Sequence, residues 1–293
     1  PPRSTLFPYT TLFRSTGTQI HAGSNYRRVV ELVQSGAIGE VQEVHVWVAA
    51  TYGGQELPRE TPPIPPGLDY DLWLGPVPWR AYSPEYVPFK WRNWWAFGGG
   101  ALADFGCHFM DLPHWALGLS HPDSAEVVDG PPVHAESTPP WLIVRYSHPR
   151  RGAQPPVSLT WYHGGKRPEL PAGTEDFEWR SGVLFVGSRG QLISDYGRHT
   201  LLPLAQFEGF QRPERFIPES IGHHQEWIRA CKTGAEATCG FAYSGPLTEA
   251  ALLGNVAYRT GRRIDWDWKR QRALGDPAAQ AYIEHTYRKG WSI

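Results

Sequence analysis

The sequence is poor in cysteine and lacks long hydrophobic runs. Its three cysteines, Cys107, Cys231 and Cys239, form neither a CxxC pair nor the spacing of a disulfide framework. No apolar segment approaches the roughly 18 residues that a membrane-spanning helix requires. Neither sign of charge dominates, because 28 Lys and Arg residues stand against 29 Asp and Glu residues. We therefore expect neither nucleic acid nor a membrane as a partner.

Several common motifs of catalysis and cofactor binding are also missing. No GxGxxG follows a strand-like segment, and neither GxSxG nor HExxH occurs. We therefore expect no dinucleotide-binding fold within these residues. His223 and His224 are adjacent and would point about 100° apart on a helix, so we expect no metal site there. Glu175, Asp176 and Glu178 could form a glycosidase pair, but a solvated polar loop is the simpler interpretation.

The composition is that of a globular protein with long connections. Of the 293 residues, 41% are hydrophobic and 19% are charged, which allows a sizeable core. The 14 Trp residues are spread along a chain in which 31 Gly and 28 Pro residues interrupt helices and strands. Aromatic side chains on broad loops often receive sugars, although a Trp-rich core with long connections explains the same composition.

The N-terminus is unlike the rest of the chain. Residues 5–15, TLFPYTTLFRS, resemble the translation of a common sequencing-library adapter. We interpret residues 1–15 as an adapter-derived artefact and residues 16–293 as the protein domain, with genuine N-terminal residues missing. A Thr-rich β-strand is the alternative. Under the adapter interpretation the N-terminus gives no information on localisation, so the sequence is compatible with a cytoplasmic or an exported protein.

The pattern of hydrophobic residues predicts helices at several places. Residues 24–36 have a buried face and a possible cap at Ser24 or Asn25, with Gly36 as terminator. Residues 101–119 read as one helix kinked by Pro113. Two further helices are expected at residues 220–234, with Ile221, His224, Ile228 and Cys231 on one face, and at residues 244–261, with Ser244 as cap. A last helix is expected near residues 283–291.

The remaining segments predict strands. Val44, Val46 and Val48 alternate with His45 and Trp47, as in a strand with one buried face. Residues 53–68 read as a loop, and the segment VGSRGQL reads as a hairpin. Because strands follow one another along the chain, we predict one α+β domain: a largely antiparallel open sheet with helices packed on one face.

The stretch GGGALADFGCHFMDLPHW contains the residue types that acid–base catalysis requires. Asp104 and His108 are four apart and Asp111 follows three later, so on a helix they share one face. A carboxylate beside an imidazole can orient it for general acid–base catalysis. Gly98, Gly99 and Gly100 allow close approach of a ligand to the helix start. The alternative is a His–Asp pair that only stabilises the helix.

Several separated segments together resemble the C-terminal part of the Gfo/Idh/MocA oxidoreductases. They are GTQIHAGSNYRRVVELVQSGAIGEVQEVHVW, YDLWLGPVPWRAYSP, GGGALADFGCHFMDLPHWALGL, IPESIGHHQEWIRACKTG and LTEAALLGNVAYRTGRRIDWD. The similarity runs from about Thr16 to the end of the chain. It is strongest to the bacterial branch that resembles inositol 2-dehydrogenases.

The resemblance implies a protein of two domains. The family has an N-terminal Rossmann domain that binds NAD or NADP and supplies a lysine for proton transfer. An α+β domain follows, which binds the substrate and makes oligomer contacts. The present chain would be this second domain, with the first missing, and we expect a homo-oligomer.

The resemblance also implies a reaction. The parent protein would be an oxidoreductase that moves hydride between NAD or NADP and a secondary alcohol of a sugar or cyclitol. The chain by itself would be inactive. Two alternatives stay open: an NAD-dependent glycosidase that works by oxidation and elimination, and a non-catalytic module that binds sugars or forms oligomers.

Asp104 and His108 match the family's D-x-x-x-H pair, with His108 as the acid–base and Asp104 as a substrate contact or orienting group. Asp111 fits the motif but could be structural. The positions of further residues suggest other contacts. The candidates for substrate binding are Arg92, Trp95, His163 and Lys166. Asn255 is a candidate cofactor contact, whereas Tyr258 is expected in the core rather than at the cofactor.

Overall fold

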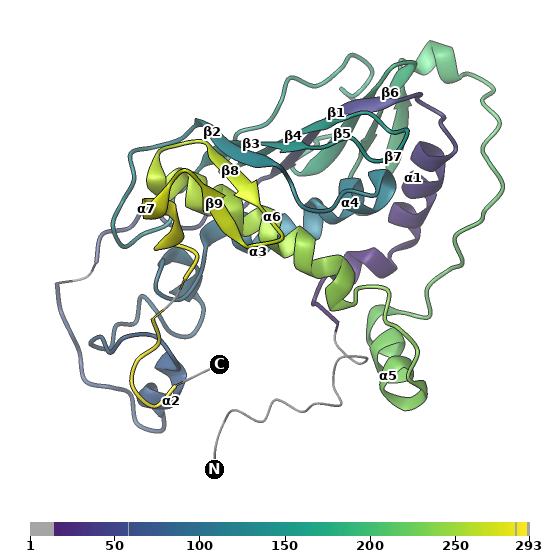
Figure 1. Ribbon diagram of the computed structural model, residues 1–293. Coiled ribbons are helices and arrows are strands. Elements are labelled where there is room, and N and C mark those ends of the chain that lie inside the picture. Colours follow the sequence, from purple (N-terminus) through teal and green to yellow (C-terminus); the bar gives the residue numbers. More distant parts are fainter. Residues whose placement is uncertain (1–14, 58, 285, 292–293) are drawn as a thin grey trace.

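The computed structural model describes residues 15–291, apart from residues 58 and 285. The expected adapter-derived segment therefore lies outside the described residues, except for Ser15. One nine-stranded sheet forms a layer, and the main helices pack against one of its faces (Figure 1). The sheet is mixed and mostly antiparallel, which confirms the predicted fold class.

The strand order in the sheet is β7-β6-β5-β1-β4-β3-β2-β8-β9. Strands β1 and β4 are parallel neighbours, while the other neighbouring pairs are antiparallel. The strands are β1 Val41–Val48, β2 Ser124–Asp129, β3 Leu142–His148, β4 Val157–His163, β5 Gly182–Gly187, β6 Gly190–Ser194, β7 His199–Leu202, β8 Ile264–Asp267 and β9 Arg272–Leu274. A two-residue turn joins β5 to β6, so the predicted hairpin is confirmed.

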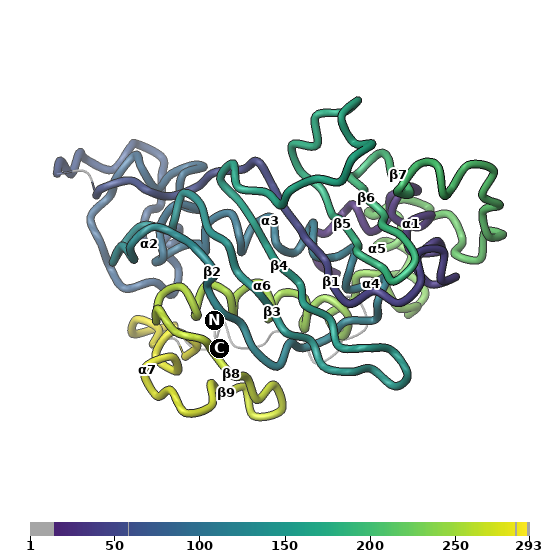
Figure 2. The backbone as a smooth tube through the Cα atoms, turned by 90° about the horizontal axis from the view of Figure 1, so that it is seen from above, coloured from purple at the N-terminus to yellow at the C-terminus, as the bar shows by residue number. Residues whose placement is uncertain are grey.

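Seven α-helices and three short 3₁₀ turns are described. They are α1 Ser24–Gln34, α2 Tyr70–Leu74, α3 Gly100–Phe109, α4 Asp111–Leu117, α5 His223–Thr233, α6 Phe241–Thr260, α7 Pro277–Gln280, η1 Gln19–Ala22, η2 Lys90–Asn93 and η3 Leu204–Phe207. Helix α6 packs along α3, and α1 packs against α4. The segment with α2 lies at one end of the molecule and α1 with α5 lies at the other (Figure 2).

The core lies between the sheet and these helices. Val44, Val46 and Val48 of β1 are buried on this side, as their alternation predicted. Trp47, on the opposite side of the strand, is buried as well. Its Nε1 donates to the carbonyl of Trp179, 2.9 Å away, because the connection between β4 and β5 folds over this part of the sheet. The expectation of a single buried face was therefore wrong at this end of β1.

The predicted kinked helix is two helices. Helix α3 ends at Phe109 and α4 begins at Asp111, with Met110 between them. Pro113 lies in the first turn of α4, where its missing N–H leaves no hydrogen bond unmade. The interruption therefore precedes the proline, and Asp111 is on a different helix from Asp104.

The predicted N-caps were wrong, whereas the predicted C-terminal glycines were right. Gly23 precedes α1, and Ser24 instead donates to Glu219. Helix α6 begins at Phe241, so Ser244 lies inside it and bonds to the Gly240 carbonyl. The three glycines beyond the helix ends adopt left-handed conformations, which glycine tolerates best: Gly36, Gly234 and Gly261.

The predicted inner face of α5 was also wrong. Glu226 and Ala230 are its buried residues, while Ile221 precedes the helix and is 51% exposed. Glu226 accepts hydrogen bonds from Ser220, Thr238 and Arg27, so a polar network decides how this helix faces the protein. The helix expected near residues 283–291 is not formed in the described part of this tail; α7 lies further upstream.

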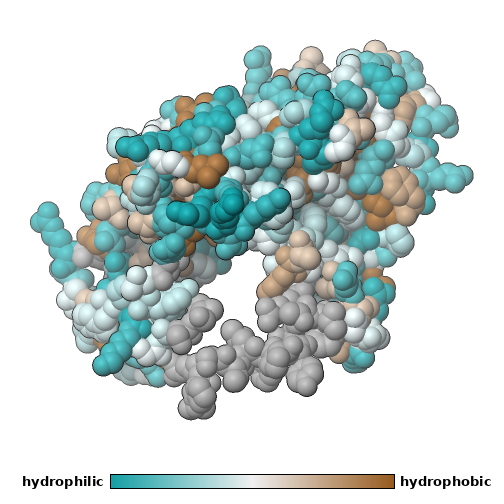
Figure 3. All heavy atoms as spheres, viewed as in Figure 1, coloured by the Kyte–Doolittle hydropathy of each residue, from teal (hydrophilic) through white to brown (hydrophobic). Residues whose placement is uncertain are grey.

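No helix within the described residues is both long and apolar enough to cross a bilayer. On the face shown in Figure 3, hydrophobic residues form separate patches between hydrophilic ones.

Candidate active site

A tight glycine turn leads into α3, the helix that carries Asp104 and His108. Gly100 has a φ of +65°, and a Cβ atom there would lie 2.8 Å from side-chain atoms of Thr138. Only glycine satisfies both conditions without strain. The turn follows η2, so Arg92 of η2 is folded back onto α3.

Arg92 holds Asp104 in place. Its Nε donates to Asp104 Oδ2 at 3.1 Å, and its guanidinium lies over the ring of Trp91 at 4.3 Å. The hydroxyl of Tyr52 faces the same carboxylate. Burial and this negative neighbour raise the pKa of the Tyr52 phenol. Asp104 is thus positioned by residues that lie before α3 in the chain.

His108 lies one turn further along α3. Its Nδ1 is buried and has no hydrogen-bond partner among the described residues, and its ring lies edge-on to Phe105 at 6.3 Å. Burial lowers the pKa of the imidazole, and the charges of Asp104 and Asp111 oppose this effect. His108 is therefore neutral near pH 7 and able to accept a proton. No hydrogen bond joins it to Asp104 in the described structure, so Asp104 acts on His108 through its charge.

Asp111 belongs to a separate buried network. It is fully buried and accepts from His21 Nδ1 at 2.9 Å and from the Tyr243 hydroxyl at 2.6 Å. The His21 ring stacks on Trp115 at 4.0 Å. These bonds tie η1, α4 and α6 together, so Asp111 has a structural role.

A cavity of about 1210 Å³ opens beside α6 and the start of α3. It is lined by four of the residues expected at the site, namely Arg92, Trp95, Asp104 and Asn255. Trp95 is fixed by a 3.1 Å hydrogen bond from its Nε1 to the His134 carbonyl. Tyr258 lies in the core, as expected, with its hydroxyl on the Pro132 carbonyl.

Three other candidates lie outside the cavity lining: His108, one turn beyond Asp104 on α3, and the pair His163 and Lys166. His163 is buried, and both ring nitrogens have protein partners, the Trp161 indole and the Pro139 carbonyl. Burial lowers its pKa to about 4. Lys166 is exposed over the ring of Trp141. His163 is thus a core residue with both ring nitrogens engaged, whereas a substrate contact by Lys166 stays a prediction.

Sequence reasoning missed Tyr52 and Arg259. Tyr52 is in a segment that reads as a loop, and Arg259 looks like an ordinary basic residue near a helix end. Tyr52 reaches Asp104 only because β1 ends beside α3, and Arg259 lines the cavity together with Asn255 one turn away. The i, i+4 spacing of Asn255 and Arg259 was the one available signal.

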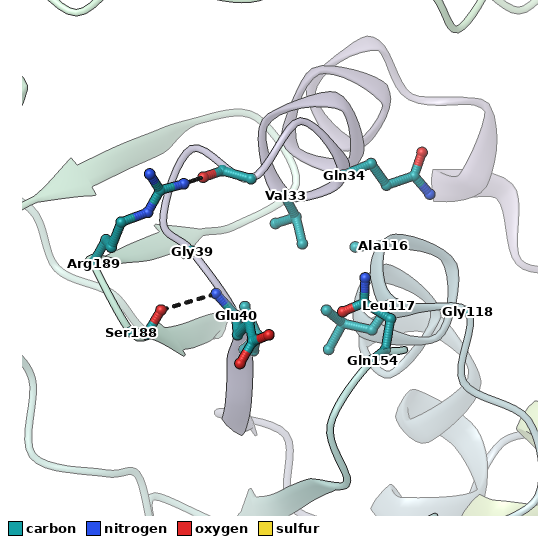
Figure 4. A pocket seen from close by; sticks show the side chains of 12 residues that line it. Val33, Gln34, Gly39, Glu40, Ala116, Leu117, Gly118, Gln154, Ser188 and Arg189 are labelled. Atoms are coloured by element: carbon teal, nitrogen blue, oxygen red, sulfur yellow. Dashed lines mark hydrogen bonds between the residues drawn. The ribbon is translucent and has the colours of Figure 1, made fainter. Parts of the chain in front are cut away.

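A second hollow, of about 570 Å³, lies at the C-terminal ends of α1 and α4 (Figure 4). Its polar groups already bind the backbone: Arg189 donates to the Gly36 carbonyl, and Ser188 accepts from the Glu40 N–H at 3.0 Å. None of the expected site residues lines it.

The side chains and glycine turns of the described residues also bear on metal and dinucleotide binding. They contain no cluster of three or more His, Cys, Asp or Glu side chains suited to a metal ion. The glycine run 98–100 opens a helix but follows η2, whereas a dinucleotide fingerprint follows a strand. The described chain therefore does not fit NAD or NADP by a Rossmann-type turn.

Residues 23–154 match the C-terminal α/β domain of the Gfo/Idh/MocA oxidoreductase family. The matched region contains the glycine turn, Arg92, Asp104 and His108. No curated protein sequence matches the chain.

Several solved structures resemble this one. They include an NAD-binding protein from Listeria innocua (12% identity, TM-score 0.52) and the aldose-aldose oxidoreductase from Caulobacter crescentus, solved with glycerol (13%, 0.51). Both alignments cover 86% of this chain and 63% of the other. The likeness establishes a shared fold. The present chain spans less than two thirds of the length of these proteins.

Proposed function

We propose that this chain is the substrate domain of an NAD(P)-dependent oxidoreductase acting on a secondary alcohol of a sugar or cyclitol. One observation carries the proposal. A neutral imidazole with a free ring nitrogen, His108, lies one helical turn from a carboxylate fixed by an arginine. The match of residues 23–154 to an oxidoreductase domain supports this interpretation.

The two side chains have different tasks in this proposal. Oxidation of a secondary alcohol releases one proton from the hydroxyl, and His108 takes it because its imidazole is neutral. Asp104 accepts a hydrogen bond from a substrate hydroxyl and stabilises the imidazolium that forms. Arg92 and Tyr52 hold Asp104 so that this geometry is fixed before the substrate binds.

NAD or NADP would supply the redox chemistry, held mainly by a further domain. The described residues do not fit a dinucleotide turn, and the solved relatives are longer than this chain. We therefore propose that residues 16–293 do not turn over alone. Purified chain should give no NAD(P) reduction with any polyol tested.

The experiment is a comparison of H108A, D104N and wild type in the full-length protein, with a panel of sugars and cyclitols. We expect stoichiometric NADH or NADPH formation in the wild type and a loss of at least about 100-fold in kcat for H108A. The exposed His224→Ala is the matched control and should keep its activity. Release of a free aglycone without net NADH would instead identify a glycosidase. If the wild type binds these sugars but neither it nor any of the variants is active, the protein is a non-catalytic module.

We also propose that the outer face of the sheet, where the β4–β5 connection leaves it uncovered, mediates homo-oligomer formation. Glu43 of β1, Val128 of β2 and Arg145 of β3 are exposed. Light scattering on wild type and R145E tests this. A wild-type monomer at micromolar concentration would contradict the proposal.

A further inference from the structure

Arg259 lines the cavity beside the site between aromatic side chains and forms no salt bridge within the described part of the chain. Its guanidinium lies 5.0 Å from the Trp95 ring and 4.1 Å from the Tyr282 ring. It makes no hydrogen bond or ion pair with any residue that the structure describes. These cation–π contacts use no N–H group as a donor to oxygen, so the N–H groups of the guanidinium stay available for a ligand.

The acidic side chains near Arg259 are already paired with other groups. Glu136 acts on Arg259 through its charge but forms its ion pair with Arg80, at 2.9 Å. Asp104 is paired with Arg92, and Glu249 accepts 2.6 Å hydrogen bonds from His121 and from Trp266. These acidic side chains are the ones that line the cavity, and both are already engaged. A half-buried cation without a carboxylate of its own is costly, and an anionic ligand would lower that cost.

The amino end of α3 adds donors at the same wall. The helix has ten residues, no side-chain cap and no acidic residue in its first turn, so its N–H groups and dipole favour an anion. Gly98, Gly99 and Gly100 line the cavity there, and no side chain on them blocks access.

Asn255 gives an independent indication of a ligand. It lies one turn from Arg259 on α6, lines the cavity and is only 7% exposed. Its Nδ2 donates to the Gly99 carbonyl at 2.9 Å, which fixes the amide orientation. Its Oδ1 has no partner in the described structure. A buried acceptor without a donor is rare and suggests a hydroxyl that arrives with a ligand.

We propose that Arg259, the amino end of α3 and Asn255 form an oxyanion subsite that selects an anionic sugar. Its carboxylate or phosphate would bind the Arg259 edge and the α3 N–H groups. An adjacent hydroxyl would donate to Asn255 Oδ1. The subsite shares the cavity with Asp104, so it would hold the charged end of a substrate whose alcohol lies near Asp104, one helical turn from His108. This last assignment rests on the proposed function, whereas the binding preference does not.

The test measures binding by calorimetry to the full 293-residue chain. The probes are glucuronate, glucose 6-phosphate and neutral glucose, each at low and high salt. We expect both anionic sugars to bind at least about tenfold more tightly than glucose, with a preference that weakens in salt. The stronger of the two identifies carboxylate or phosphate as the recognised group.

The variants are R259Q, R259K and R180Q. R259Q should abolish the preference, and R259K should keep only part of it, because a lysine preserves charge but not the planar fork. R180Q removes an exposed arginine elsewhere and should match wild type. Thermal unfolding checks that each variant is folded. If R259Q does not fold, R259K and salt dependence still decide the question.

Equal affinity for glucuronate, glucose 6-phosphate and glucose would overturn the proposal, and so would absent binding or an unchanged preference in folded R259Q. These results are independent of catalysis. An inactive full-length protein with an intact anionic preference would refute the proposed oxidoreductase and leave the subsite standing. An active protein without the preference would do the reverse.

Discussion

Arg92 Nε lies 3.1 Å from Asp104 Oδ2. This ion pair distinguishes Asp104 from Asp111, which follows seven residues later and has different partners. Asp104 faces a cavity and is fixed by an arginine. Asp111, on the next helix, is fully buried against His21 and Tyr243. Sequence spacing placed both on one face, whereas the break at Met110 assigns them to different environments.

The charge of Asp104 should be measurable at His108. D104N should lower the pKa of the His108 imidazole further, because Asp104 is the largest influence that opposes the effect of burial. An NMR titration of the His108 ring protons measures this. D129N, at the exposed end of β2, is the control and should leave the titration unchanged. A raised His108 pKa in D104N would contradict the electrostatic role of Asp104.

The two aspartates should differ in their effect on stability. D111A leaves His21 and Tyr243 without their buried acceptor and should reduce the free energy of unfolding by about 3–5 kcal/mol. D104A removes a partly exposed ion pair and should cost about 1 kcal/mol or less. Urea denaturation of both variants gives the comparison. Equal losses would show that Asp104 is structural too.

Stability should fall with acidity between about pH 6.5 and pH 4. Burial lowers the pKa of His114 and of His163 to about 4 and lowers the pKa of His148 well below its usual value. Below pH 6.5 the unfolded chain binds protons that the folded chain excludes, so unfolding is favoured. His114 and His163 should each account for about 3 kcal/mol of loss by pH 4.

Urea midpoints at several pH values measure this dependence. In H163N the loss between pH 6.5 and pH 4 should be smaller, because one titrating group is gone. A stability that is flat over this range would mean that these histidines are accessible to protons in the folded state.

Two glycines of α6 should differ in how much alanine destabilises the protein. A Cβ at Gly254 would lie 2.1 Å from the Tyr146 hydroxyl and 2.8 Å from Leu102, so G254A should destabilise the protein by about 1–3 kcal/mol. Gly245 has no atom of another segment within 4 Å of such a Cβ, but it precedes Pro246, whose ring opposes a Cβ on the preceding helical residue. G245A should therefore change the stability by less than about 1 kcal/mol. Thermal unfolding of the two variants tests the close packing of α6. A tolerated G254A would show that this packing can relax.

The sequence alone determined the local structure. Alternating valines predicted β1, and the Gly-Ser-Arg-Gly segment predicted the β5–β6 hairpin, because both signals depend on neighbours in the chain. Glycines that follow α1, α5 and α6 end these helices for the same reason. The sequence also indicated Asp104 and His108 as candidates, through their spacing and their family resemblance.

Only the tertiary structure decided which polar groups meet. The pairing of Arg92 with Asp104, the approach of Tyr52 and the burial of His163 depend on contacts between segments distant in the chain. The inner face of α5 was mispredicted because a buried glutamate network outweighs hydrophobic spacing. The environment of Arg259 likewise depends on the fold, which brings two aromatic rings, Trp95 and Tyr282, to its guanidinium. Hydrophobic patterning specifies elements, whereas desolvation and charge pairing within the packed fold specify the site.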